Sequence, residues 1–281
     1  MSNPTIQRRR LGIVLKQARE RAGKTRDESA EIIDARSSKI SRIELGQSAL
    51  RLTDLGILCD FYGVGEQERE VMRDMARAGR QRGRWNSYRN SLPTWFRQYI
   101  DLEGDATELR WYQAEIVPGV LQTESYVRGL YGIEGSGPAD EETERQIRIR
   151  LERQTIVEEP TSELSFILSE SALRRVVGSP ATMRDQLRHL AEVGTRQHVE
   201  IQVLPFEAQT YTTSSYGFTV MRFDEAASDV IYVEDFTDAN YLDRPEDVKV
   251  YTRLWDALRA SALGAVESRR LITRVAGEFG E

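Results

Sequence analysis

Short hydroxyl and long cationic side chains cluster between residues 37 and 42 of the chain. The cluster consists of Ser37, Ser38, Lys39, Ser41 and Arg42. Such groups are the donors and acceptors that reach phosphate oxygens and base edges in the major groove of DNA. Ile40 and Ile43 are interleaved at helical spacing, which would turn the polar groups outward on one side of a helix. The chemistry of the segment is therefore that of a helix that contacts DNA.

A second helix, joined by a tight turn, is expected just before that segment. Thr25 and Glu28 have the spacing of a capping box, which predicts that this helix begins near residue 25. Ser37 or Ser38 is the expected capping residue where the following helix starts. Residues 25–46 are thus predicted to form a helix, a turn and a helix.

A further helix is expected upstream. Leu11, Val14, Leu15 and Ala18 recur at helical spacing, and Gly23 fits the glycine that commonly follows a helix end. The core of the whole N-terminal domain is expected to contain Leu11, Leu15, Ile32, Ile40, Ile43, Leu52, Leu55 and Leu58.

Residues 8–64 resemble the Xre family of helix-turn-helix domains, the five-helix phage-repressor type. The resemblance implies an ion pair between Arg19 and Glu44, which in many such repressors ties the first helix to the recognition helix. The chain departs from the family at Arg26, where glutamine is usual and where arginine favours phosphate contact. It also departs at Asp34, which replaces the turn glycine and tolerates the left-handed conformation better than most residues. Contacts with double-stranded DNA are expected from Arg26, Arg36, Ser37, Ser38, Lys39, Ser41, Arg42, Gln47 and Arg51.

Charge is distributed unevenly along the chain. The whole sequence has 39 Lys+Arg and 45 Asp+Glu, a net charge of −6. Residues 1–84 contain 18 Lys+Arg and 12 Asp+Glu, a net of +6, so the remainder has 21 and 33, a net of −12. This asymmetry favours a head that binds a polyanion on a body that repels one. Two arginine runs flank the head and either contact phosphates or remain without contacts: Arg8, Arg9 and Arg10, and Arg77, Arg80, Arg82, Arg84 and Arg89.

Length and composition predict two domains. A chain of 281 residues with 40% hydrophobic content can bury two cores. Residues 1–78 are expected to form the DNA-binding domain, with a last helix over 66–78 in which Val71, Met72, Met75 and Ala76 recur at helical spacing. Residues 79–92 are polar, basic and punctuated by glycine, which indicates a linker. The second domain is expected to cover 93–281, opening with a helix after Pro93.

The second domain alternates helices and strands. Strands are predicted at 108–113, 164–169, 199–204, 217–223 and 229–234. Helices are predicted at 122–132, 140–158, 180–194, 245–262 and 264–277, the fourth with a stripe of Val248, Tyr251, Trp255, Leu258 and Ala262. The three strands from 199 to 234 are expected to pair antiparallel, with helices on one face. The fold class is therefore an all-α head and an α+β domain with a mainly antiparallel sheet.

Catalytic, metal and membrane functions have little support in the sequence. No run of 18 apolar residues and no apolar N-terminal signal segment is present, so we expect a soluble cytoplasmic protein without a membrane contact. The single Cys59 lies in an apolar helix and is expected to be a core thiol. His189 and His198 stand apart from any cysteine cluster, so no metal site is predicted. No catalytic constellation and no phosphate-binding glycine loop is recognisable, so no cofactor and no enzymatic activity are expected.

Two features of the second domain could form a ligand site, although each has a simpler structural interpretation. Residues 117–123 either line a pocket or make a strand-to-helix turn that Thr123 caps. A set of aromatic residues either lines a pocket or belongs to the core: Trp95, Trp111, Tyr112, Phe218, Tyr232 and Trp255.

Segments 111–126, 167–175 and 203–206 resemble a group of regulators from filamentous, antibiotic-producing bacteria that includes WhiJ-like proteins. In that group an Xre domain precedes a domain of poorly defined function, often beside a gene for a small partner protein. The resemblance implies developmental regulation and assigns no chemistry to particular residues.

Three functional classes follow from these patterns. One is a dimeric transcription regulator, such as a repressor, whose second domain senses a small molecule or a small protein. Another is an antitoxin-type protein that sequesters a small partner and autoregulates. The third is an enzyme with a DNA-binding head. A homodimer held mainly by residues 95–281 is expected, with Trp255 and Leu258 pairing across the two-fold axis.

Overall fold

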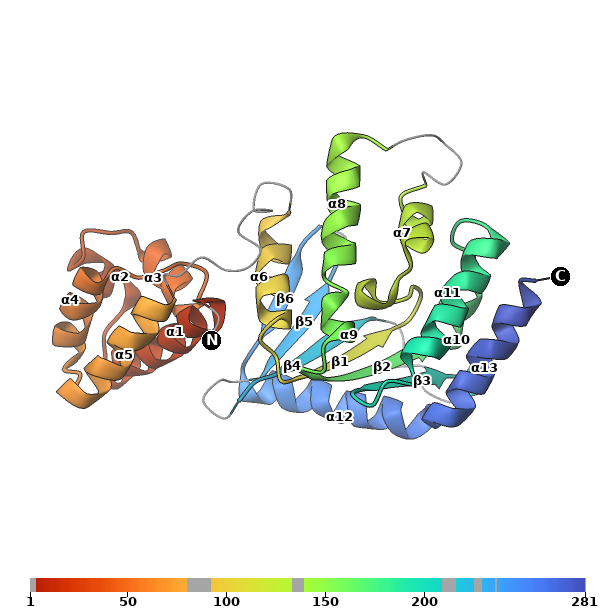
Figure 1. Cartoon of the computed structure of the whole chain (residues 1–281). Coiled ribbons are helices and arrows are strands. Elements are labelled where there is room, and N and C mark those ends of the chain that lie inside the picture. Colours follow the sequence, from red (N-terminus) through yellow and green to blue (C-terminus); the bar gives the residue numbers. More distant parts are fainter. Residues whose placement is uncertain are drawn as a thin grey trace. The chain divides into compact units, whose positions relative to one another are not determined.

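The protein consists of two compact units (Figure 1). The structure is a computed structural model and describes residues 4–79, 92–132, 139–208, 216–224, 229–235 and 237–280. Among these, unit 1 comprises 4–79 and 96–105, and unit 2 comprises the rest. This division differs from the predicted boundary at residue 93, because most of α6 (Thr94–Glu103) falls in unit 1. Of the predicted basic linker, 79–92, the segment 80–91 with four of its arginines lies outside the described residues.

Unit 1 contains five consecutive helices, as predicted. They are α1 (Pro4–Arg21), α2 (Arg26–Glu31), α3 (Ser37–Glu44), α4 (Leu52–Tyr62) and α5 (Glu66–Ala78). Six of the eight predicted core residues are buried, and Ile32 and Leu52 pack partly buried against them. On α5, Met72 and Ala76 are buried, whereas Val71 is 51% exposed. The reason is angular: Val71 lies one residue from Met72, about 100° away around the helix.

Cys59 is fully buried in α4, and its thiol lies 3.7 Å from the Sδ atom of Met72. Burial raises the pKa of this thiol, because the thiolate would lose its hydration. The prediction of a core thiol is confirmed.

Unit 2 is built on a six-stranded mixed sheet with the order β3-β2-β1-β4-β5-β6. The strands are β1 (Glu108–Gln113), β2 (Glu163–Ser169), β3 (Val199–Leu204), β4 (Phe218–Arg222), β5 (Val230–Glu234) and β6 (Ala239–Leu242). Strands β1, β2 and β3 pair in parallel, and the other three pairings are antiparallel. The α+β class with a mainly antiparallel sheet is thus confirmed, and β6 is an additional strand that was not predicted.

The predicted antiparallel partner of β3 is wrong. Strand β3 lies at one edge and pairs in parallel with β2, with Leu164 opposite Val199. The connection over residues 205–217 is longer than a hairpin loop. Strand β4 therefore need not lie beside β3 and instead pairs with β1, two strands away in the sheet.

Helices cover both faces of this sheet, not one as expected. They are α7 (Glu124–Leu130), α8 (Glu141–Glu152), α9 (Thr155–Glu158), α10 (Glu170–Arg174), α11 (Pro180–Val193), α12 (Pro245–Ser261) and α13 (Ala265–Glu278), with a 3₁₀ turn, η2, at Gly119–Leu121. Helix α12 lies on one face, while α8 and α7 lie on the other (Figure 1). The adjacent residues Trp111 and Tyr112 are both buried, which requires cover on each face because neighbouring strand residues point opposite ways. No described helix is long and apolar enough to cross a membrane.

Two predictions about aromatic residues are corrected by this arrangement. Trp255 and Leu258 of α12 are at most 1% exposed and belong to the core of unit 2, so they are not available to pair across a two-fold axis. Tyr112 packs in that same core, whereas Trp111 faces the other side of the sheet and stacks on Phe166. The aromatic residues are therefore divided between two faces and do not line one pocket.

Candidate nucleic-acid interface

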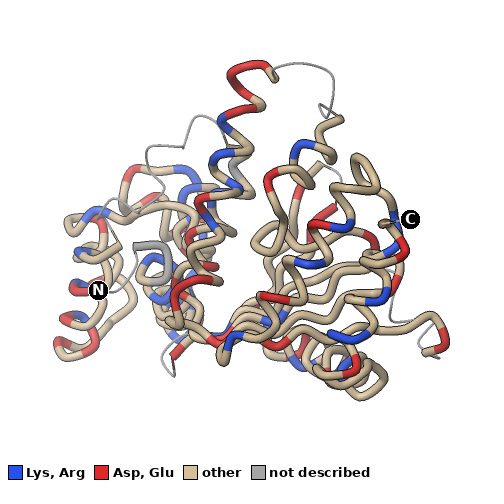
Figure 2. Tube along the Cα trace, turned by 45° about the vertical axis from the view of Figure 1, so that its right-hand side comes forward, with Lys and Arg blue, Asp and Glu red and all other residues tan. Residues whose placement is uncertain are grey.

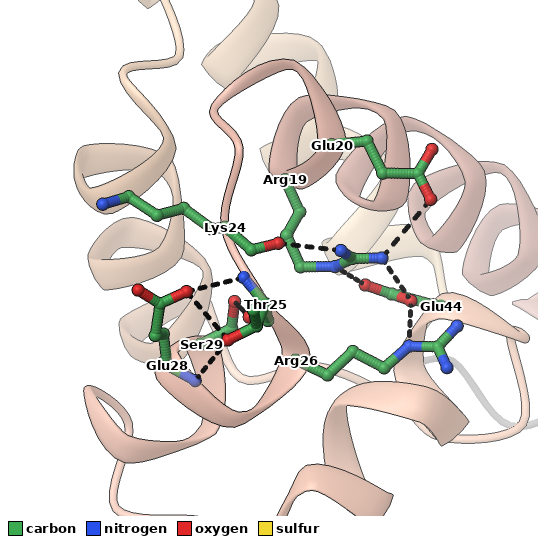
Figure 3. A network of polar contacts seen from close by, with 8 residues as sticks. All are labelled: Arg19, Glu20, Lys24, Thr25, Arg26, Glu28, Ser29 and Glu44. Atoms are coloured by element: carbon green, nitrogen blue, oxygen red, sulfur yellow. Dashed lines mark hydrogen bonds and ion pairs between the residues drawn. The ribbon is translucent and has the colours of Figure 1, made fainter.

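The helix-turn-helix begins with the predicted capping box. The Glu28 backbone N–H donates to Thr25 Oγ1 at 3.2 Å, and the Thr25 backbone N–H donates to Glu28 Oε2 at 2.7 Å (Figure 3). These two bonds satisfy donors at the start of α2 that have no partner within the helix. The first turn of the motif is thereby fixed by residues from a single short stretch of sequence.

The turn between α2 and α3 uses a left-handed residue. Asp34 has φ = 48° and is the one described residue other than glycine with positive φ. The Ala35 N–H returns to the Ala30 carbonyl at 2.9 Å, which closes the turn. The tolerance predicted for aspartate at this position is confirmed.

The predicted serine cap of α3 is wrong. The residue that precedes the helix is Arg36, which has extended backbone angles and makes no side-chain cap bond. Ser37 and Ser38 are the first two helical residues, so their hydroxyls are not engaged as caps. The helix therefore begins at Ser37, with Arg36 in the capping position.

A buried ion pair joins α1 to α3, as the family resemblance implied. Arg19 Nε donates to Glu44 Oε1 at 2.5 Å and Arg19 Nη2 donates to Glu44 Oε2 at 3.2 Å (Figure 3). Both residues are buried, at 8% and 6% exposed. The hydrogen bonds that Arg19 donates to Glu44 raise the pKa of Arg19, which keeps the guanidinium charged. The bidentate geometry therefore fixes the end of the recognition helix against the rest of the domain.

Close backbone packing supports the same joint. A Cβ atom at Gly12 of α1 would lie 2.5 Å from the carbonyl oxygens of both Ile43 and Glu44. Only a residue without a side chain permits α1 and α3 to approach this closely.

Arg26 shares the carboxylate of Glu44. Its Nε lies 2.9 Å from Glu44 Oε2, while its side chain is 44% exposed (Figure 3). The bond uses the inner edge of the guanidinium and leaves the two terminal nitrogens pointing away from the carboxylate. Arg26 is thus held in one orientation at the N-terminus of α2 with its outer donors presented to solvent.

The nine predicted DNA-contacting residues differ in exposure. Arg26, Arg36, Ser38, Arg42, Gln47 and Arg51 are exposed, and Ser37, Lys39 and Ser41 are partly buried. Lys39 donates to Asp54 Oδ2 on α4 at 2.9 Å, so its ammonium is engaged within the domain. On α3, Ile40 and Ile43 are each 2% exposed, and the polar residues between them face outward. The structure therefore places Ser38 and Arg42 on one outward face of α3, with the exposed Arg36 at its N-terminal end.

The N-terminal arginine run is packed, not free. Arg9 is 7% exposed, and Arg8 lies 4.0 Å from Asp101 with a side chain that is 17% exposed. This favours the interpretation in which the run does not contact phosphates.

Unit 2 contains a buried polar cluster around residues 117–123. The Thr123 hydroxyl accepts from the Tyr126 N–H at 3.3 Å, which confirms the predicted strand-to-helix turn with a threonine cap. Gln122 is fully buried, donates from Nε2 to the Val117 carbonyl at 2.6 Å and accepts from Arg150 Nη1 at 2.9 Å.

Gln186 of α11 closes this cluster from the other side. Its Nε2 donates to the Leu121 carbonyl at 2.7 Å, and its Oε1 accepts from the Thr123 N–H at 2.7 Å. Gln186 and Arg150 were not predicted, because a single polar residue in a helix has no pattern that separates it from a solvated one.

Comparison with known protein families divides the chain in a similar way. Residues 10–72 match the family described as a helix-turn-helix domain. This range contains both helices of the motif, α2 and α3, and with them Glu44. The fold and this match agree on a helix-turn-helix domain at the N-terminus, the kind of domain that supports DNA binding. No curated protein and no solved structure matches the chain significantly. Residues 96–274, well over half of the sequence, match the domain of unknown function DUF5753, and the chain therefore belongs to the DUF5753 family, with a helix-turn-helix domain at its N-terminus.

Proposed function

We propose that this protein is a sequence-specific transcription regulator that binds double-stranded DNA through α3 and acts in the cytoplasm, with no enzymatic role. The observation that carries the proposal is the outward face of α3. Ser38 and Arg42 are exposed there, while the opposite face is anchored by Ile40 and Ile43. A recognition helix needs this division, because its inner face must hold its position while its outer face enters the groove.

The exposed arginines have separate roles in this proposal. Arg42 and Ser38 read base edges from the middle of α3. Arg26 and Arg51 lie at the N-terminal ends of α2 and α4, where they contact phosphates and position the domain. The ion pair with Glu44 holds the guanidinium of Arg26 in one orientation for a contact with a phosphate.

DNA-binding assays with single substitutions test these roles. Arg42→Ala and Ser38→Ala are expected to weaken binding to a selected operator by about 1–3 kcal/mol each and to relax its sequence preference. Arg26→Ala and Arg51→Ala are expected to weaken binding to all sequences and to reduce the slope of affinity against salt by about one each. Arg21→Ala is the matched control, since Arg21 is an exposed arginine at the end of α1 that pairs with Glu68. Unchanged operator affinity of Arg42→Ala at an unaltered melting temperature would remove α3 from the reading surface.

Unit 2 is proposed to sense a small molecule or a small protein in the manner of WhiJ-like developmental regulators. An antitoxin-type protein that sequesters a small partner is the second candidate. Residues 85–281 have a net charge of −12, which favours a basic protein partner in either case. The two functions differ in what the partner does. In a sensor, binding of the partner raises or lowers the affinity of the protein for its operator. A sequestering protein inactivates its partner even in the absence of DNA.

A homodimer is also proposed, because one helix-turn-helix reads about half of an operator and half-sites are usually about one helical turn apart. Light scattering of the full chain is expected to give the mass of two copies at micromolar concentration. A monomer that still protects a symmetric operator would place the dimer contact on the DNA-bound heads.

A further inference from the structure

Two arginines of α8 and its C-terminal end converge on Gly119. A Cβ atom built on Gly119 would have Arg153 Nη1 at 3.5 Å and Arg150 Nη1 at 3.8 Å as its nearest nitrogen neighbours. Acidic residues fill the first turn of α8, whereas Arg150 lies in its last turn (Figure 2). The absence of a side chain at residue 119 therefore leaves two guanidinium groups facing the same backbone position.

The partners of Arg150 are neutral. Its Nη1 donates to the amide oxygen of Gln122 at 2.9 Å, and the hydroxyl of Tyr131 is a second hydrogen-bonding neighbour. No ion pair joins it to a carboxylate of the described residues. Glu234 acts on it through its charge, and this residue accepts a hydrogen bond from Tyr232 at 2.8 Å.

The environment of Arg150 disfavours its own charge. Burial lowers the pKa of Arg150, and the neighbouring charge of Arg153 lowers it further. An arginine that is partly removed from water usually has a carboxylate opposite it, because burying a charge without compensation is unfavourable. A bound anion would provide that compensation here.

Arg150 is not sealed from solvent. The residue is half-buried, so part of its side chain remains exposed to a dissolved anion. The orientation of the Gln122 amide is fixed, because its Nε2 donates to the Val117 carbonyl. Gln122 therefore offers Arg150 only a neutral oxygen and no compensating charge.

We propose that Arg150, with Arg153 beside it, binds a small oxyanion, a carboxylate or a phosphate, next to Gly119. The guanidinium presents two parallel N–H donors whose spacing matches the two oxygens of either group. This inference rests on the proposed sensing role of unit 2 and names the class of molecule that the unit would sense. It does not depend on the contacts of α3 with DNA.

Isothermal titration of the full chain, free of DNA, tests the site. Sodium phosphate and sodium citrate are the two probes, each titrated at constant ionic strength adjusted with sodium chloride. Gly119→Ala blocks the site with a methyl group that makes ordinary contacts at 3.5 Å and so leaves the fold intact. Arg150→Gln removes the charge. Arg148→Gln, an exposed position on the same helix, is the control with the same loss of charge.

Saturable binding of at least one probe is expected for the unaltered chain and for Arg148→Gln. Its affinity is expected to fall about tenfold or more in Gly119→Ala and in Arg150→Gln, with the melting temperature of Gly119→Ala unchanged. Phosphate binding alone or citrate binding alone would each support the site and identify its class of ligand. Absence of saturable binding by either probe, or binding that survives both Gly119→Ala and Arg150→Gln, would overturn the proposal. Operator affinity measured without anion is a separate readout and is expected to be the same in Gly119→Ala.

Discussion

Replacing Glu44 with glutamine is expected to destabilise unit 1 by about 3 kcal/mol. The substitution keeps the size of the side chain and removes the charge that faces Arg19, whose side chain is 9% exposed. Removing one partner of a buried ion pair costs about 3–5 kcal/mol, because the other charge remains buried without compensation. The lower end applies here, since Arg19 also donates to the Lys24 carbonyl at 2.9 Å and lies 3.5 Å from Glu20.

Hydrogen exchange measured by mass spectrometry can localise this effect to unit 1. Amides in the middle of α4, around Leu55 and Leu58, exchange through opening of the unit 1 core, because both side chains are fully buried. A loss of about 3 kcal/mol corresponds to exchange about a hundredfold faster. Amides of β1 in unit 2 provide the internal reference, and their protection is expected to stay the same.

Two further variants test whether the buried pair of Arg19 and Glu44 holds α3 in place. Arg26→Ala removes the more exposed arm of the same network and is expected to cost less than about 1 kcal/mol. The double variant Arg19→Met with Glu44→Leu removes both buried charges and is expected to recover most of the loss. If Glu44→Gln costs no more than Arg26→Ala, the buried pair does not hold α3 as described.

Three other substitutions in unit 1 have definite expectations. Gly12→Ala is expected to destabilise the unit by about 3 kcal/mol or more in urea denaturation, since its methyl group would meet backbone carbonyls at 2.5 Å; a stable variant would disprove the close approach of α1 and α3. Asp34→Ala should cost about 1 kcal/mol, whereas Asp34→Gly should be nearly neutral, because φ is 48° there; equal effects of the two would contradict a left-handed turn. The N–H and hydroxyl of Thr25 lower the pKa of Glu28, so the capping box stabilises above its unfolded pKa of about 4.3 and that stability is lost as the pH falls through the lower folded value. Glu28→Gln is expected to flatten this part of the acid unfolding curve, and an unchanged curve would count against the capping box.

Features that depend on neighbouring residues could be predicted from the sequence. The capping box of Thr25 and Glu28 and the left-handed Asp34 each follow from a few consecutive positions. The ion pair of Arg19 with Glu44 needed a family resemblance, because the two residues are 25 positions apart. All five predicted strands are present, since β-branched and aromatic runs indicate a strand without reference to its partners.

Features that depend on distant partners could not be predicted in this way. The parallel pairing of β3 with β2 depends on contacts between strands about 35 residues apart, which the residue pattern within one strand does not reveal. The engagement of Lys39 by Asp54 depends on the angle between α3 and α4. The surroundings of Arg150 come from three segments, the turn at Gly119, the side chain of Gln122 and the end of α8, and no spacing along the chain connects them.

The central position of β1 in the sheet has a consequence for synthesis of the chain. Its partners β2 and β4 begin at Glu163 and Phe218, and the last strand of the sheet ends only at Leu242. Helices α1 to α5, in contrast, are complete at Ala78. Domains generally fold as units, the N-terminal one first, while the ribosome adds about 5–20 residues per second. Strand β1 is therefore synthesised on the order of ten seconds before its last neighbour, β4. Parallel strands that must close long loops also fold more slowly than local helices. A nascent chain therefore carries a folded helix-turn-helix while the strand edges of unit 2 are still open, and such unpaired edges are the surfaces through which incomplete chains aggregate.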